Sequence, residues 1–393
     1  PIKSSAASDV YKSQGTDGIN FSLASREMIA NMIEIHANAT PFDGGVYISS
    51  CDKGMPANLM GLARVNIPSV VVTGGTMHAG PELLTLEQLG MYSAKYERGE
   101  IDEAKLNWAK QNACPSCGAC SFIGTASTMQ IMAEALGLAL PGSALLPATS
   151  PDLVEYARRA GYQAVVLAKQ GLRPSDVVTM DSFENAIMVH AAISGSTNAL
   201  LHLPAIAHEF GISIDGDTFD RLHRGAKYLL DIRPAGRWPA EFFYYAGGVP
   251  AIMEEIRDVL HLDAMTVTGK TLGENLDELK TNGFYEHCQQ LLDEEQHIVY
   301  LDSFGRVESL AITYAEKYKN FTDIRRQIGA LQMDEAEKAR RVDTLQYQIE
   351  ELRRAKLTPG EEEELTARRG MLRNAEKFLD AVAGADYALN GDD

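Results

Sequence analysis

Three of the chain's five cysteines lie within seven residues, in the run CPSCGAC at residues 114–120. A C-x2-C-x2-C spacing lets thiolates converge on a soft metal ion or on an iron–sulfur cluster. A helical pattern over residues 125–136 follows the run, and the positive end of a helix stabilises nearby thiolates. Metal or cluster binding, redox-active thiols and inert packing are all compatible with this spacing.

A thiol, a carboxylate and an amine stand in three consecutive residues, Cys51, Asp52 and Lys53. They follow a strand-like run, and ligands of open α/β sheets bind beyond the carboxyl ends of the strands. The thiol suits a soft iron centre, and Asp52 suits a hard cation such as Mg²⁺. The alternative is a turn in which Lys53 is solvated and Asp52 caps the next helix.

Small polar residues form a third group, Ser194-Gly195-Ser196-Thr197-Asn198, directly before an apolar helical segment. Hydroxyl residues at a helix start leave backbone N–H groups free to meet an anion such as a carboxylate or phosphate. Ordinary capping of the helix by one of these side chains is equally compatible with the pattern.

The elements that would position these groups alternate between strand and helix. Residues 46–49 and 69–72 read as buried strands, and the segments 28–35, 129–136 and 199–210 read as helices. This alternation predicts an α/β fold with a mostly parallel sheet and flanking helices over residues 1–296.

Composition changes near residue 297. Charged residues make up 34 of the 97 residues from His297 to Asp393, against 56 of the 296 before them. Val342, Leu345, Ile349 and Leu352 follow the spacing of a coiled-coil seam, and a second seam begins at Leu372. The segment Thr358-Pro359-Gly360-Glu361 between the seams carries helix-start signals. Residues 297–393 are therefore predicted to form an antiparallel helical hairpin.

Composition also excludes some classes of protein. The formal net charge of −18 argues against nucleic-acid binding as the main activity. No apolar run reaches the roughly 20 residues of a membrane span, and an odd cysteine count gives no disulfide framework. We expect a cytoplasmic protein. Because it begins with Pro1 rather than methionine, we expect the chain to start inside a longer reading frame.

Together these groups resemble the dihydroxy-acid and sugar-acid dehydratase family, over about residues 9–296. The resemblance is carried by these stretches: SLASREMIA (22–30), SCDKGMPANLMGLARVNIPSVVVTGGTM (50–77), ACPSCGACSFIGTASTMQIMAEALGLALPGS (113–143), SGSTNALLHLPAIAHEFGI (194–212), AGGVPAIM (246–253) and TVTGKTLGENL (266–276).

The resemblance implies a hydro-lyase that removes water from a 2,3-dihydroxy acid, such as a sugar acid, to give a 2-keto acid. It implies a [2Fe–2S] cluster and Mg²⁺ as cofactors, and a homodimer. Residue by residue, it implies that Cys51 and Cys120 are cluster ligands and that Asp52 is a Mg²⁺ ligand. It also implies that Lys53 is carbamylated to become an anionic Mg²⁺ ligand. The substrate pocket would include Ser196, Thr197 and Asn198.

The resemblance is incomplete at both ends. The family's first cluster cysteine would lie upstream of Pro1, and Asp9 is the candidate for its first Mg²⁺-binding aspartate. The family's glutamate Mg²⁺ ligand and serine base belong to a second domain, whose motifs are absent from residues 297–393. Cys114 and Cys117 fall at variable positions of the family motif and receive no role.

From about Tyr300 the chain instead resembles the arm of the RecN-type DNA-repair ATPase. The matching stretches are LDSFGR (301–306) and residues 333–381, including TPGEEEEL. No phosphate-binding loop motif occurs, so no ATPase activity is expected, and a net charge of −4 in this region argues against DNA contact. The sequence thus predicts a dehydratase, or alternatively a catalytically incompetent composite of a dehydratase fragment and a RecN fragment.

Overall fold

A computed structural model describes residues 17–290, 308–356 and 358–391. The chain divides into two compact units, Pro1–Ile298 and Val299–Asp393. Each unit is described by itself. Asp9 and the stretch 301–306 lie outside the described residues.

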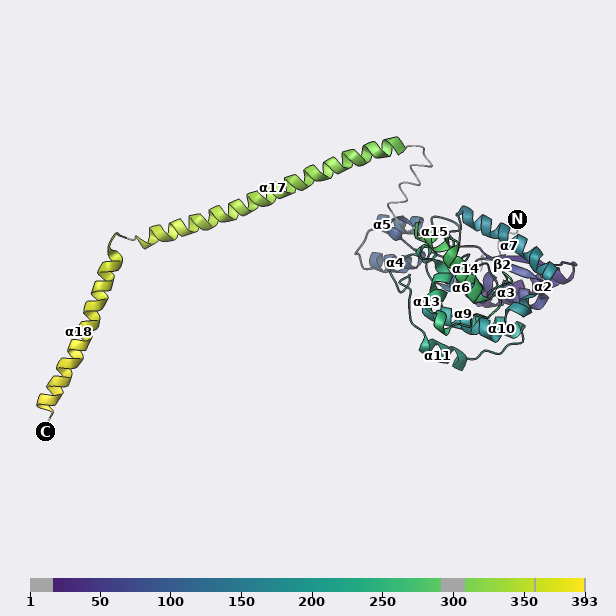
Figure 1. Cartoon of the computed structure of the whole chain (residues 1–393), viewed down its shortest axis with the longest axis horizontal. Helices are drawn as coiled ribbons and strands as arrows, with labels where there is room; N and C mark the ends of the chain where they lie inside the picture. Colours follow the sequence, from purple (N-terminus) through teal and green to yellow (C-terminus); the bar gives the residue numbers. More distant parts are fainter. Residues whose placement is uncertain (1–16, 291–307, 357, 392–393) are drawn as a thin grey trace. The chain divides into compact units, whose positions relative to one another are not determined.

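The first unit is mostly helical around a small sheet (Figure 1). Its helices and strands are α2 (Ser22–Asn38), β1 (Gly45–Ser49), α3 (Gly54–Val65), β2 (Ser69–Thr73), α4 (Leu89–Glu97), α5 (Glu103–Asn112), α6 (Thr125–Ala135), α7 (Pro151–Gln170), α8 (Pro174–Val177), α9 (Met180–Ala192), α10 (Ala199–Glu209), α11 (Gly216–Gly225), α12 (Glu241–Tyr245), α13 (Gly248–Glu255), α14 (Leu272–Thr281) and α15 (Phe284–Gln290).

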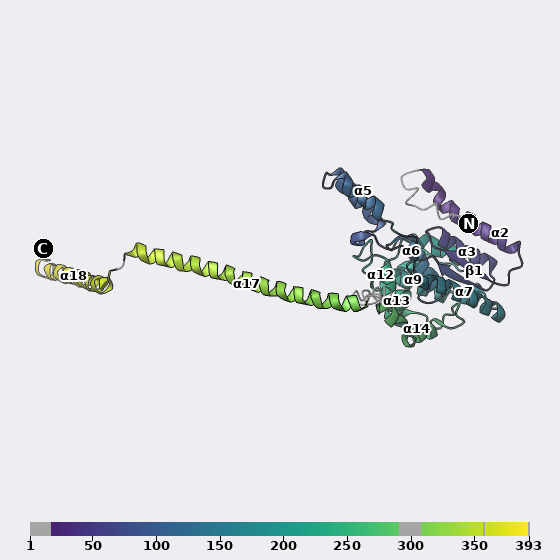
Figure 2. The same ribbon diagram turned by 90° about the horizontal axis from the view of Figure 1, so that it is seen from above.

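A β1-α3-β2 unit supplies the two strands of the sheet. The two strands pair in parallel, in a register that runs from Gly45 opposite Ser69 to Ser49 opposite Thr73. The strands lie between α3 and α7 in both views (Figures 1 and 2). The predicted parallel α/β arrangement is confirmed, with a sheet of two named strands.

The two strands differ in burial. Every residue of β2 is buried: β1 and a bridge from Val71 to Ala139 cover its two edges, and helices α7 and α6 pack against it. In β1, by contrast, Val46 is 39% exposed and Ile48 is 67% exposed. Residues 46–49 were predicted to form a buried strand, and the burial part of this prediction is therefore wrong. The strand exists, but its alternate side chains point to a face that lies away from the core.

Helix α6 lies at the centre of the core. All of its residues from Ala126 to Ala135 are buried, and Met129, Ile131 and Met132 are among the largest fully buried side chains. It packs against α9, α3 and β2. The three helices predicted near residues 28–35, 129–136 and 199–210 correspond to α2, α6 and α10. Because α6 is buried along its length, packing holds the side chains of its first turn in a fixed position.

A buried carboxylate fastens the loop that follows α6. Glu134 accepts backbone N–H bonds from Gly142 (2.6 Å) and Ala144 (2.7 Å), one on each carboxylate oxygen. In Glu134→Gln one oxygen becomes an NH₂ group, which faces a backbone donor and leaves it unsatisfied. We expect the free energy of unfolding to fall by about 1–3 kcal/mol. Urea unfolding measures this loss. Glu155→Gln, on the exposed surface of α7, is the control and should leave the midpoint unchanged.

The same carboxyl group makes stability depend on pH. Burial raises the pKa of Glu134 from 4.5 to about 7, against the opposing effect of its backbone N–H donors. A raised pKa means that the folded state holds the proton after the unfolded state has lost it. Stability should therefore fall as pH rises from about 4.5 to about 7, then level off. This component should be absent in Glu134→Gln, and an unchanged pH profile in that variant would contradict the assignment.

The second unit contains two helices, α17 (Glu308–Ala355) and α18 (Glu361–Asn390). The backbone N–H of Thr358 donates to Glu361 Oε2 at 3.1 Å, which is one of the two bonds of a capping box. Helix α18 nevertheless begins at Glu361 rather than Pro359, because Gly360 adopts a positive φ of 89° immediately before it. Among the described seam residues, Leu345 is 52% and Leu372 is 66% exposed. The two helices are thus confirmed, whereas their antiparallel packing stays a prediction.

Within the described residues, no helix combines the length and the apolar character needed to cross a membrane.

Candidate functional site

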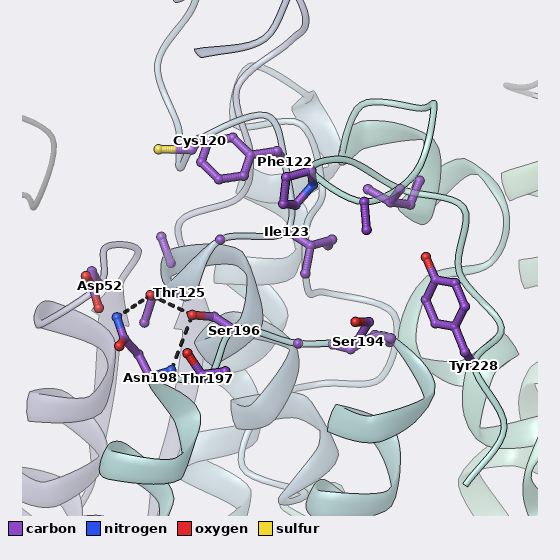
Figure 3. A pocket seen from close by; sticks show the side chains of 17 residues that line it. Asp52, Cys120, Phe122, Ile123, Thr125, Ser194, Ser196, Thr197, Asn198 and Tyr228 are labelled. Carbon is purple, nitrogen blue, oxygen red and sulfur yellow. Dashed lines mark hydrogen bonds between the residues drawn. The ribbon is translucent and has the colours of Figure 1, made fainter. Parts of the chain in front are cut away.

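A pocket of about 420 Å³ brings together residues from four distant parts of the first unit. Its polar side carries Asp52, Cys120, Thr125 and the segment Ser196–Asn198 (Figure 3). The other lining residues are Phe122, Ile123, Gly124, Ala126, Ile193, Ser194, Gly195, Tyr228, Ile232, Pro234 and Ala235. The pocket lies at the N-terminal ends of α6 and α10, and Asp52 comes two residues before α3 begins.

Asp52 and Lys53 occupy the turn between β1 and α3. Lys53 Nζ lies 3.2 Å from Asp52 Oδ1, and the two side chains are only 11% and 7% exposed. Lys53 is the N-cap residue of α3, which has no side-chain capping bond. The alternative of a solvated Lys53 beside a capping Asp52 is therefore wrong. Only Asp52 of the Cys51–Lys53 group lines the pocket.

Backbone pairing with the segment after β2 positions Cys120. The N–H of Met77 donates to Ala119 O at 2.8 Å, and the N–H of Ala119 donates to Gly75 O at 2.9 Å. This places Cys120 on the same side of the pocket as Asp52 (Figure 3). Cys114 and Cys117 are exposed instead, and neither lines the pocket. The structure thus separates Cys120 from the other two cysteines of the run.

A network of short hydrogen bonds joins the first turn of α6 to the start of α10 (Figure 3). Thr125 Oγ1 and Ser196 Oγ lie 3.0 Å apart, and Asn198 Nδ2 donates to Thr125 Oγ1 at 2.8 Å. Asn198 is the N-cap residue of α10 but makes no side-chain capping bond. Its side chain spans to α6 instead of capping its own helix, so the network fixes two helix starts against each other.

A buried histidine, His190, forms a hydrogen bond with the backbone of the Ser194–Asn198 segment. His190 is 4% exposed, and its Nε2 lies 3.0 Å from the carbonyl oxygen of Ser196. Burial lowers the pKa of His190, which favours a neutral ring that donates this bond. A Cβ atom on Gly195 would come within 2.5 Å of the ring. Glycine is therefore required for this close approach.

The sequence did not single out three residues of this region. Thr125 joins the polar network, while His202 on α10 and Arg26 on α2 lie behind Asp52. The spacing gave one usable signal, because His202 follows Asn198 by four residues and so shares its helix face. No local pattern points to Arg26, which reaches His202 from 176 residues away.

The donor set for a metal is partial. Among the residues that the structure describes, no group of three or more His, Cys, Asp or Glu side chains is arranged to hold a metal ion. Asp52 supplies one buried carboxylate and Cys120 one thiol beside the pocket, with Cys51 in the adjoining turn. These donors fit part of a cation site and part of a cluster site.

Comparisons with known proteins show the family to which the chain belongs. Residues 2–275 match the family model described as "Dihydroxy-acid/6-phosphogluconate dehydratase N-terminal". The dihydroxy-acid dehydratase of Solidesulfovibrio magneticus is 45% identical over 268 residues, covering 67% of this chain and 48% of the relative. Dihydroxy-acid dehydratase 1 of Methanosarcina acetivorans is 45% identical over 273 residues, covering 68% and 49%. The dihydroxy-acid dehydratase of Sulfurisphaera tokodaii is 42% identical over 279 residues, covering 70% and 50%.

The chain spans about half the length of these relatives. The matched residues include every group that builds the pocket, from Asp52 to Ala235. The chain therefore belongs to the dihydroxy-acid/6-phosphogluconate dehydratase family, of which it carries the N-terminal region.

Proposed function

We propose that the pocket binds a short 2,3-dihydroxy acid and belongs to a hydro-lyase that removes water from it to give a 2-keto acid. The observation that carries this proposal is the convergence of Asp52, Cys120 and the Ser196–Asn198 segment on one cavity. Family membership supports the reaction class.

The polar side of the pocket suits the hydroxylated, anionic end of such a substrate. Thr125, Ser196 and Asn198 offer hydroxyl and amide groups on a preorganised network. The starts of α6 and α10 add their positive ends, which favour a carboxylate. We therefore assign Ser196, Thr197 and Asn198 to substrate binding.

The remaining lining favours a branched alkyl tail over a sugar chain. It is largely apolar, with Phe122, Ile123, Ile193 and Ile232 among its members. Of the residues that the structure describes, no lysine, arginine or histidine lines this pocket, and Asp52 is the one acidic side chain that does. A phosphorylated sugar acid would leave its phosphate without a cationic partner and its hydroxyl groups against hydrocarbon.

We propose that Asp52 and Lys53 hold Mg²⁺ and that Cys51 and Cys120 hold part of a [2Fe–2S] cluster. As the chain stands, Lys53 is a cation paired with Asp52. Carbamylation, in which the neutral amine adds CO₂ and loses a proton, would turn it into a second anionic oxygen ligand beside Asp52. The bound groups would supply Lewis acidity at the leaving hydroxyl and the carboxylate. Asp9, which belongs to the same expected set, lies outside the described residues.

We also propose a cytoplasmic homodimer. Thiol ligands need a reducing compartment, which the cytoplasm provides. The dimer follows only from membership in the family.

A second candidate function is a protein that keeps the dehydratase pocket without turnover. The partial donor set among the described residues favours it, because removing one member of a catalytic group costs orders of magnitude in rate. In this alternative residues 297–393 are a RecN-like segment of no catalytic role.

The test is an assay of the full chain, purified without oxygen and reconstituted with iron, sulfide and Mg²⁺. The hydro-lyase proposal predicts an iron-containing brown protein that forms a 2-keto acid from 2,3-dihydroxy-3-methylbutanoate. Bound substrate without turnover would select the second candidate. A colourless, iron-free protein that binds no dihydroxy acid would contradict both.

A further inference from the structure

We propose that His202 is a positioning residue for Asp52: held by Arg26 in one tautomer, it directs its Nε2–H at the Asp52 carboxylate and fixes that group at the pocket. The inference deepens the proposed function and, in its consequence for a bound cation, rests on it.

His202 is a polar side chain buried in the core. It is fully buried on α10, a helix that packs against α3 directly beyond Asp52. Its Nε2 atom has no hydrogen-bond partner among the residues that the structure describes, which is a costly state for a buried polar atom. This atom lies 3.6 Å from Asp52 Oδ1. A movement of a few tenths of an ångström would close this gap to a hydrogen bond.

Arg26 decides which ring nitrogen carries the proton. Its NH1 atom lies 3.1 Å from His202 Nδ1. A guanidinium group has only donors, so Nδ1 must accept this bond and cannot itself hold a proton. The proton of the neutral ring is therefore on Nε2, the nitrogen that faces Asp52. The contact also excludes a doubly protonated ring.

Arg26 is itself held in place. Its Nε and NH2 atoms both donate to Glu27 Oε1, at 3.1 and 2.7 Å, and the Arg26 side chain is only 11% exposed. The chain of contacts thus runs from Glu27 through Arg26 and His202 to Asp52. Each link is set by donor and acceptor chemistry and requires no change of charge.

The consequence concerns the orientation of the carboxylate. While Lys53 is an unmodified amine, its Nζ and His202 Nε2 both approach Oδ1 of Asp52. The His202 donor restricts rotation of the carboxylate and sets the direction of the other oxygen, and carbamylation of Lys53 does not remove this donor. Partners of this kind, one shell behind a ligand, change metal affinity by about 10- to 100-fold. Loss of His202 or Arg26 should weaken a cation at Asp52 without removing any ligand.

The first arm of the test is independent of any metal. Histidine ring nitrogens of the full chain are labelled with ¹⁵N, and the His202 signals are assigned by their loss in His202→Gln. We expect a neutral ring with its proton on Nε2, a changed tautomer or protonation state in Arg26→Met, and a shifted Nε2–H signal in Asp52→Asn. A proton on Nδ1 in the wild-type chain, or signals indifferent to both variants, would overturn the proposal.

The second arm measures binding of Mn²⁺ as a probe, by electron paramagnetic resonance of the free ion. His202→Leu and Arg26→Met should weaken binding about 10- to 100-fold. His202→Gln, whose amide can accept from Arg26 and donate to Asp52, should restore most of it. His208→Leu, on the exposed face of the same helix, is the matched control and should bind normally. Normal binding by His202→Leu would also overturn the proposal.

The two arms separate this inference from the proposed function. If the wild-type chain binds no Mn²⁺, the proposed cation site at Asp52 is contradicted. The ring-nitrogen signals still decide whether His202 directs its proton at Asp52.

Discussion

Replacing Asp52 with asparagine is expected to weaken Mn²⁺ binding by more than about 100-fold, beyond the 10- to 100-fold effect of a residue behind a ligand. Within the described part of the chain, Asp52 is the one acidic side chain that lines the pocket, and this side chain is 7% exposed. Asparagine keeps its shape but removes the negative charge that a hard cation requires. Titration of the full chain with Mn²⁺ measures the loss.

The same substitution leaves Lys53 as a nearly buried ammonium without its carboxylate. We therefore also expect a lower unfolding midpoint for Asp52→Asn, because an unpaired buried charge is destabilising. Asp43→Asn, an exposed carboxylate in the turn before β1, is the matched control and should change neither quantity. Mn²⁺ affinity equal to that of the wild-type chain would show that Asp52 holds no cation.

Replacing Gly118 with alanine is expected to lower the free energy of unfolding by about 2–5 kcal/mol, from backbone strain and overpacking together. Gly118 has a φ of 117°, which side-chain-bearing residues rarely adopt. A Cβ atom there would lie 2.5 Å from the backbone nitrogen of Met77 and 2.5 Å from the carbonyl carbon of Thr76. Neither backbone atom can move without breaking the pairing that positions Cys120.

Gly118→Ala should change ligand binding at the pocket as well as the stability of the fold. Because the cysteine loop must shift, we expect weaker binding of a dihydroxy acid even below the unfolding transition. Gly161→Ala is the matched control: it lies in helix α7 with open space around its Cα, so alanine should stabilise the helix by up to about 1 kcal/mol. A Gly118→Ala protein as stable as the wild-type chain would refute this account of the loop.

The resemblance to the dehydratase family predicted which groups meet, whereas the local patterns left each group with an alternative interpretation. Locally, the Cys51–Lys53 group follows a strand, where ligands of open α/β sheets bind, and the other two groups precede helices. The structure brings Asp52, Cys120 and the Ser196–Asn198 segment to one pocket accordingly. The spacing of the cysteine run does not distinguish Cys120 from Cys114 and Cys117, and only the family resemblance singled out Cys120. In the structure, backbone pairing between Ala119 and the 75–77 segment brings Cys120 to the pocket.

Other features depend on contacts between distant elements. The exposure of Val46 and Ile48 depends on what covers the outer face of β1, which a local apolar run does not reveal. The contact between Arg26 and His202 joins α2 to α10. Both residues lie in stretches that resemble the family, 22–30 and 194–212, but the resemblance assigned a role to neither of them. In the second unit the heptad spacing of apolar residues predicted the helices α17 and α18. The spacing does not indicate which surface packs against their exposed apolar residues.

The central claim is that this pocket accepts a short 2,3-dihydroxy acid with a branched alkyl tail. Isothermal titration of the reconstituted full chain, in Mg²⁺, with 2,3-dihydroxy-3-methylbutanoate and separately with 6-phosphogluconate tests it most directly. We predict binding of the branched acid, loss of that binding in Asp52→Asn, and at least about tenfold weaker binding of the phosphorylated sugar acid. Tighter binding of 6-phosphogluconate, or binding of neither acid by the wild-type chain, would contradict the claim.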